Sequence, residues 1–105
     1  MLRIYPVIVE MLRELGPVLR ELEGRDRELV CQARRAAQSV LLNVAEGSGH
    51  TGGNRRQRYK TALGSMRETS ACLDAAEALG MLDGVPGVLR QRIAHVTGTL
   101  VKLAA

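Results

Sequence analysis

The chain has 105 residues, of which 46% are hydrophobic and only two, both Tyr, are aromatic. Fifteen Lys and Arg residues against eleven acids give a formal net charge of +4. Because no uncharged apolar run is long enough to span a bilayer and no signal peptide is recognisable, we exclude a membrane protein and expect one cytoplasmic domain over residues 1–105.

Apolar residues recur at alternating spacings of three and four along most of the chain, the pattern of amphipathic helices. Glycine, proline and aspartate interrupt this pattern, so we expect the helices to be joined by short turns. The predicted helices cover residues 4–23, 26–46, 54–79 and 86–103. Four helices with short connections favour an all-α fold, an antiparallel up-down-up-down four-helix bundle.

Particular residues are expected to shape the helix ends. Pro17 should kink or break the first helix because it lacks a backbone N–H donor. Asp26 and Asn54 are the expected N-caps of the second and third helices. Gly47 should end the second helix in the left-handed conformation that glycine adopts readily, and Gly80 should end the third.

The glycines between the second and third helices need a separate interpretation. Gly47, Gly49 and Gly52 spell G-x-G-x-x-G, the spacing of a dinucleotide-binding turn. That turn follows a strand, whereas a predicted helix precedes this one. The P-loop pattern fails too, since Gly53 and Asn54 stand where it needs Lys and Ser or Thr. We therefore interpret the segment as a mobile connector and expect no cofactor.

Positive charge is concentrated directly after this connector. Residues 1–53 are neutral overall, and residues 54–105 carry the whole excess. The excess equals the charge of four residues: Arg55, Arg56, Arg58 and Lys60. A helix N-terminus favours acidic side chains, so basic residues here oppose the helix dipole and point to a functional reason. We predict that these four side chains bind phosphate groups or an acidic partner surface.

A polar stripe is predicted on each of the two central helices. One stripe comprises Gln32, Arg35, Ser39, Asn43 and Glu46, and the other comprises Arg58, Thr61, Ser65, Glu68 and Cys72. Folding the helices back about residue 52 pairs residues whose numbers sum to about 104. Ser39 should then face Ser65, and Asn43 should face Thr61.

The same register predicts two salt bridges, Arg35–Glu68 and Glu46–Arg58, in a polar seam between the helices. Gly64 would let the helices approach closely. If the first pair is buried, removal of one partner should cost roughly 3–5 kcal/mol. The alternative is that these side chains face solvent, where ion pairs contribute only about 0–1 kcal/mol.

The sequence argues against catalysis. Neither His50 nor His95 falls near the seam, so no Ser-His-Asp set forms. Cys31 and Cys72 lack the spacing of metal ligands and are expected to be buried free thiols. We expect a protein that is not an enzyme and binds no metal. An RNA-degrading enzyme is the alternative, and it would use Arg35, Glu46, His50 and Glu68.

Two segments resemble the four-helix-bundle family of 23S rRNA-intervening sequence proteins: QARRAAQSVLLNVAEGSG (Gln32 to Gly49) and RYKTALGSMRETSACLDAAEALGML (Arg58 to Leu82). The family pattern reads roughly Q-x-x-R-A-A-x-S-x-x-x-N-x-A-E-G, then A-x-G-S-x-x-E. The matching residues are Gln32, Arg35, Ala36, Ala37, Ser39, Asn43, Ala45, Glu46 and Gly47, and then Ala62, Gly64, Ser65 and Glu68. The chain departs from the pattern at His50, where family members often carry Arg.

The resemblance implies a bacterial cytoplasmic bundle that assembles as a ring-like homopentamer. A structurally related accessory protein of diversity-generating retroelements binds its reverse transcriptase and nucleic acid. By this analogy we expect a non-enzymatic oligomeric module that contacts RNA or DNA phosphate backbones through the basic patch. The alternative is an adaptor that docks an acidic protein partner such as a reverse transcriptase. Missing aromatic side chains count against base stacking.

Overall fold

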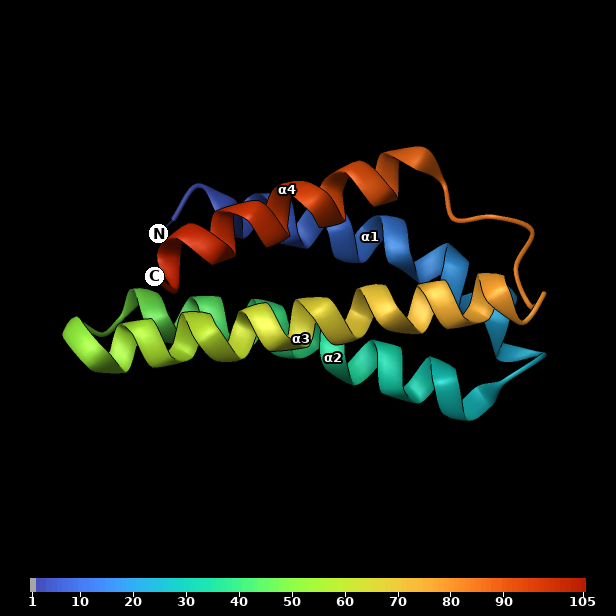
Figure 1. The fold of residues 1–105 in the computed structure, drawn as a ribbon, viewed down its shortest axis with the longest axis horizontal. Coiled ribbons are helices and arrows are strands. Elements are labelled where there is room, and N and C mark those ends of the chain that lie inside the picture. Colours follow the sequence, from blue (N-terminus) through green and yellow to red (C-terminus); the bar gives the residue numbers. More distant parts are fainter. Residues whose placement is uncertain (1) are drawn as a thin grey trace.

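Four helices form an antiparallel bundle in the structure, a computed structural model that describes residues 2–105 (Figure 1). The helices are α1 (Ile4–Glu23), α2 (Arg27–Ser48), α3 (Gly52–Ala78) and α4 (Gly87–Leu103). The most extensive helix pair is α2 with α3, and α1 and α4 pack against it and against each other. The bundle is elongated, with extents of 43 × 24 × 19 Å. The prediction of an all-α four-helix bundle is confirmed.

The core is almost entirely aliphatic. The apolar stripe of α1, from Ile4 to Leu22, is buried, and side chains such as Met66 and Leu100 meet it from the other helices. Tyr59 is the one aromatic side chain buried within residues 2–105, at 2% exposure. In the same part of the chain, no helix combines the length and apolarity that crossing a bilayer requires.

Of the kink or break predicted at Pro17, the break is wrong. The helix α1 continues through Pro17, whose ring is exposed. Leu15 and Val18, on either side of the proline, are buried in the core. Burial of these neighbours stabilises the helical path on both sides of the missing backbone hydrogen bond.

Two helix ends follow the predicted chemistry. The carboxylate of Asp26 accepts a hydrogen bond from the backbone N–H of Leu29 at 2.9 Å, so Asp26 caps α2. Gly80 follows α3 with a φ of +73°, and the N–H of Met81 donates to the carbonyl of Ala76 at 2.9 Å. This is the Schellman arrangement, which satisfies the last carbonyls of a helix.

The turn between α2 and α3 is shorter than predicted. The helix α2 passes through Gly47 and ends at Ser48, so Gly47 does not end it, and its φ is not positive. The positive φ in this turn, +63°, belongs to Gly52, the first residue of α3. Thr51, rather than Asn54, stands at the N-cap, and its side chain makes no capping hydrogen bond.

Packing against α3 explains why a glycine stands at position 47 within α2. A Cβ atom at Gly47 would lie 2.8 Å from Cε1 of Tyr59 and 3.2 Å from Cβ of Arg58. Glycine therefore makes room for the Tyr59 ring where α3 packs against α2. At Gly64, by contrast, an added Cβ would meet no atom within 4 Å, so Gly64 does not mediate the close approach predicted for it.

Candidate nucleic-acid interface

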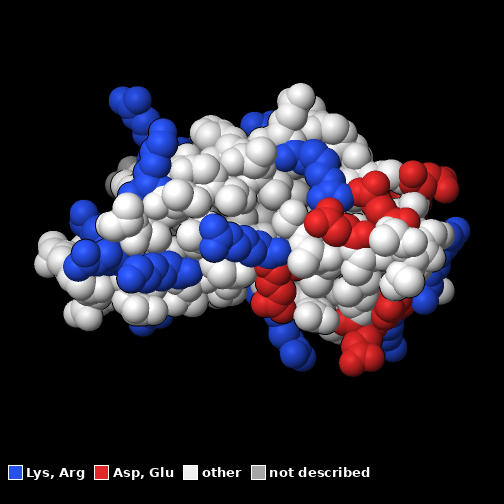
Figure 2. All heavy atoms as spheres, in the orientation of Figure 1, with Lys and Arg blue, Asp and Glu red and all other residues white. Residues whose placement is uncertain are grey.

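Charge is distributed unevenly along the long axis of the bundle (Figure 2). If each helix is divided at its midpoint, one half contains the α2–α3 turn and both ends of the described chain (Figure 1). We call this half the basic end, because it holds seven of the fifteen Lys and Arg residues and only two of the eleven acids. The basic residues are Arg3, Arg13, Arg55, Arg56, Arg58, Lys60 and Lys102, and the acids are Glu10 and Glu46.

All four residues of the predicted basic patch are exposed on the first turns of α3. Arg56 and Lys60 stand four residues apart and share one face of the helix, whereas Arg55 and Arg58 stand three apart and share another. The patch therefore has two sides rather than one flat surface. Arg67 lies seven residues after Lys60, so it extends the first side along the helix.

None of these four cations forms an ion pair with an acid in the described part of the chain. Nε of Arg55 donates to the backbone carbonyl of His50 at 2.8 Å, which fastens the turn to α3. Nη1 of Arg58 donates to Oδ1 of Asn43 at 3.4 Å. Arg56 and Lys60 have no hydrogen-bond partner among residues 2–105. Their charges are thus available to an external anion.

Sequence reasoning missed that Arg3 and Lys102 lie at the same end of the bundle as the patch. These residues lie near opposite ends of the chain, and only the bundle brings α1 and α4 to the end that carries the α2–α3 turn (Figure 1). Both side chains are exposed. No local pattern in the sequence could have placed them together.

Side-chain hydrogen bonds join the two polar stripes at three points, but neither predicted salt bridge forms within residues 2–105. Oγ of Ser65 donates to Oγ of Ser39 at 2.8 Å, the contact that the register predicts. Arg58 contacts Asn43 rather than Glu46. In both failed pairs the residue on α3 bonds to a side chain three residues earlier on α2, one helical turn away.

Glu68, at the other end of the seam, also bonds to a residue of α2 that lies one helical turn before its predicted partner. It accepts a hydrogen bond from Nε2 of Gln32 at 3.4 Å, and Arg35 is exposed without a partner in the described chain. Arg35 and Glu68 are both exposed, so the buried ion pair is wrong. Exposed side chains gain little from pairing, and the shorter amide of Gln32 loses less conformational freedom in meeting Glu68.

A line of hydrogen bonds connects the seam to the basic patch. Nδ2 of Asn43 donates to both the carbonyl and Oγ of Ser39, at 2.9 and 3.0 Å, and Ser39 in turn meets Ser65. Asn43 also accepts from Arg58. The seam therefore holds one face of α3 against α2 and orients the guanidinium of Arg58.

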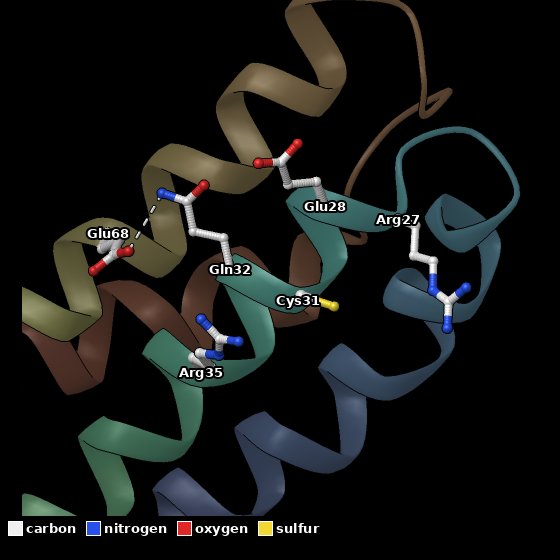
Figure 3. Close-up of a pocket in the computed structure, with 6 residues that line it drawn as sticks. All are labelled: Arg27, Glu28, Cys31, Gln32, Arg35 and Glu68. Carbon is white, nitrogen blue, oxygen red and sulfur yellow. Dashed lines mark hydrogen bonds between the residues drawn. The ribbon is translucent and has the colours of Figure 1, made fainter.

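A large cavity, of about 650 Å³, opens beside the other end of the seam (Figure 3). Arg27, Glu28, Cys31, Gln32, Arg35 and Glu68 line it. In Figure 3, Gln32 and Glu68 point toward each other, while Arg27 points away from them. The lining carries two cations and two carboxylates, so it offers no net preference for an anion.

The four residues of the alternative enzyme do not form one site. Arg35 and Glu68 line the large cavity, whereas Nε2 of His50 lies 3.8 Å from Oε1 of Glu46 at the basic end. Eleven residues of helix separate Arg35 from Glu46, a rise of roughly 16 Å. His50, predicted to lie away from the seam, instead stands next to its last residue.

The two cysteines differ in burial. Both are free thiols; Cys72 is buried, and Cys31 is only half-buried. Burial raises the pKa of the Cys72 thiol, and the negative charge of Glu68 raises it further. No group of three or more potential metal ligands gathers anywhere in residues 2–105.

Comparison with models of protein families gives a match over most of the chain. The model of a family described as 23S rRNA-intervening sequence protein matches residues 4–100, which include all of α1, α2 and α3 and most of α4. No curated protein and no solved structure matches the chain.

Proposed function

The chain belongs to the 23S rRNA-intervening sequence protein family, and we propose that it is a non-enzymatic module that binds the phosphate backbone of RNA or DNA through its basic end. One observation carries this proposal. Arg55, Arg56, Arg58 and Lys60 are exposed together, and no acid pairs with them in the described chain. Unpaired cations release condensed counterions from nucleic acid when they meet its phosphates, which favours binding.

The side chains around the patch favour contact with the backbone rather than with stacked bases. The buried ring of Tyr59 offers no stacking platform, and Tyr5, the other aromatic residue, is only partly exposed. Proteins that bind single strands by stacking use exposed aromatic rings. We therefore expect affinity to depend strongly on salt and weakly on sequence. Four phosphate contacts to a single strand correspond to a slope of log K against log salt of about −3.

Assembly would strengthen this binding. The family resemblance implies a homopentameric ring, in which five copies at +4 would carry a formal charge of +20. A ring would present five basic ends to one strand or fold of nucleic acid. Linked weak contacts of this kind bind much more tightly than one contact alone.

The test compares two variants that lose the same charge. The first replaces the patch by Arg55→Gln, Arg56→Gln, Arg58→Gln and Lys60→Gln. The control replaces four exposed arginines of the opposite half that have no ion-pair partner among residues 2–105: Arg20→Gln, Arg25→Gln, Arg27→Gln and Arg34→Gln. Affinity for a fluorescently labelled single-stranded RNA is measured by anisotropy at several salt concentrations.

We expect the patch variant to lose most of its affinity, with a salt slope smaller by about 3, and the control to keep both. Equal losses in the two variants would show that net charge, not the patch, determines binding. Unchanged binding by the patch variant would contradict the proposed function.

A further inference from the structure

The surface is hollowed where the α2–α3 turn meets the first turns of α3. We call this cavity of about 370 Å³ the turn hollow. Its lining residues are His50, Asn54, Gln57, Arg58 and Thr61. The four residues from α3 follow one another at spacings of three, one and three, so they share one face of the helix, and His50 closes the side toward the turn.

The lining differs in charge from that of the large cavity. No carboxylate lines the turn hollow, whereas Glu28 and Glu68 line the larger one. The carboxamides of Asn54 and Gln57 have no hydrogen-bond partner in the part of the chain that the structure describes. The guanidinium of Arg58 makes a single long contact, to Asn43, and its other N–H groups are available. The hollow therefore presents several unused hydrogen-bond donors to an anion.

The backbone around the hollow adds to its positive potential. The first turn of α3 contains no acidic residue, and Thr51 provides no side-chain cap, so the first N–H groups of the helix have no side-chain acceptor from their own N-cap. These groups favour a negative charge nearby. The bond from Arg55 to the carbonyl of His50 fixes the turn at the mouth of the hollow.

We infer that the turn hollow holds one nucleotide of a single-stranded nucleic acid, with its phosphate on Arg58 and its sugar or base edge against the carboxamides of Asn54 and Gln57. This inference rests on the proposed function and names the place where one nucleotide is gripped. The volume exceeds the need of a bare phosphate and lies within the range of pockets that hold small ligands. Carboxamides offer a donor and an acceptor side by side, which suits the edge of a base.

The inference predicts a loss of affinity without any loss of charge. We would prepare the double variant Asn54→Ala/Gln57→Ala and, as a matched control, Gln38→Ala/Gln91→Ala, which removes two exposed carboxamides outside the hollow. For the labelled single-stranded RNA, the hollow variant should bind about three- to tenfold more weakly at every salt concentration, with an unchanged salt slope. The control should bind like the unaltered protein.

A second measurement tests the hollow without RNA. The unaltered protein, labelled with ¹⁵N, is titrated with adenosine 5′-monophosphate, with adenosine and with inorganic phosphate. We expect the monophosphate to shift the amide signals of residues 50–61, with weaker effects from the other two compounds, and the hollow variant to lose this response.

The outcomes separate the two proposals. Unaltered RNA binding by the hollow variant, or equal effects of inorganic phosphate and the monophosphate, would overturn the nucleotide site. The proposed function would still stand if the patch variant bound RNA much more weakly than the unaltered protein. If the unaltered protein bound no RNA, the proposed function would fail, while the monophosphate titration would still decide on the hollow.

Discussion

Gly47 is needed for packing rather than for backbone conformation. A pattern of glycines in a sequence indicates a turn, but it does not separate a glycine with positive φ, such as Gly52, from one that makes room for a neighbouring ring. The difference depends on Tyr59, which is twelve residues away and meets Gly47 only because α3 folds back on α2. Sequence reasoning therefore identified the residue and assigned it the wrong role.

Substitution of Gly47 should reveal this role. We expect Gly47→Ala to lower the free energy of unfolding by about 1–3 kcal/mol, because the added Cβ overlaps the buried ring of Tyr59. Gly64→Ala is the matched control: it meets nothing within 4 Å inside the same pair of helices and should raise stability by about 0.5–1 kcal/mol. Urea unfolding followed by circular dichroism measures both. A similar response from the two variants would contradict the packing argument.

The two thiols should differ in reactivity. The thiolate is the reactive form of cysteine, and the raised pKa of Cys72 leaves less thiolate at any pH below that pKa. Its burial also restricts access, whereas Cys31 is half-buried. We therefore expect iodoacetamide to alkylate Cys31 well before Cys72 in the native protein. The rate of alkylation at Cys72 should increase as the pH increases. Peptide mass spectrometry gives the order, and faster labelling of Cys72 would refute it.

At the scale of the helices, a helix end was predictable where a local residue marks it. A helix end was not predictable where packing between helices sets its position. Asp26 and Gly80 act as the sequence indicates, because a cap and a left-handed glycine are local features. The α2–α3 turn is limited to residues 49–51, since both helices continue toward each other beyond the predicted ends. Contacts between distant helices, such as the bonds of 2.9 and 3.1 Å from Arg92 to Glu14, have no local signal either.

The cap of α2 gives a prediction at this scale. Asp26→Ala removes the acceptor for the N–H of Leu29 and should lower the free energy of unfolding by about 1 kcal/mol. Asp83→Ala makes the same change of charge at an exposed residue of the α3–α4 connection that has no hydrogen-bond partner within the described chain, and it should have little effect. Thermal unfolding of the two variants tests the difference. Equal melting temperatures would mean that the cap contributes nothing.

At the scale of the whole molecule, the sequence identified the basic patch because four of its charges are nearly consecutive. It did not identify the basic end, since Arg3 and Lys102 join the surface only through the bundle. The turn hollow was missed for a related reason. No local pattern marks it, since the shared face of Asn54 and Gln57 matters only once His50 folds beside them.

The assembly and its ligand can be tested together by native mass spectrometry on protein purified gently, without nuclease or high salt. We expect five subunits with additional mass that RNase or DNase removes, because five basic ends would hold a strand that one end binds only weakly. Raising the salt during purification should strip this mass and leave the ring. A bare pentamer from the gentle preparation would instead favour an adaptor for an acidic protein, and a nuclease-treated pull-down would then identify that partner. A bare monomer would contradict the ring, and with it the argument that charge is multiplied by assembly, because a single copy carries only +4.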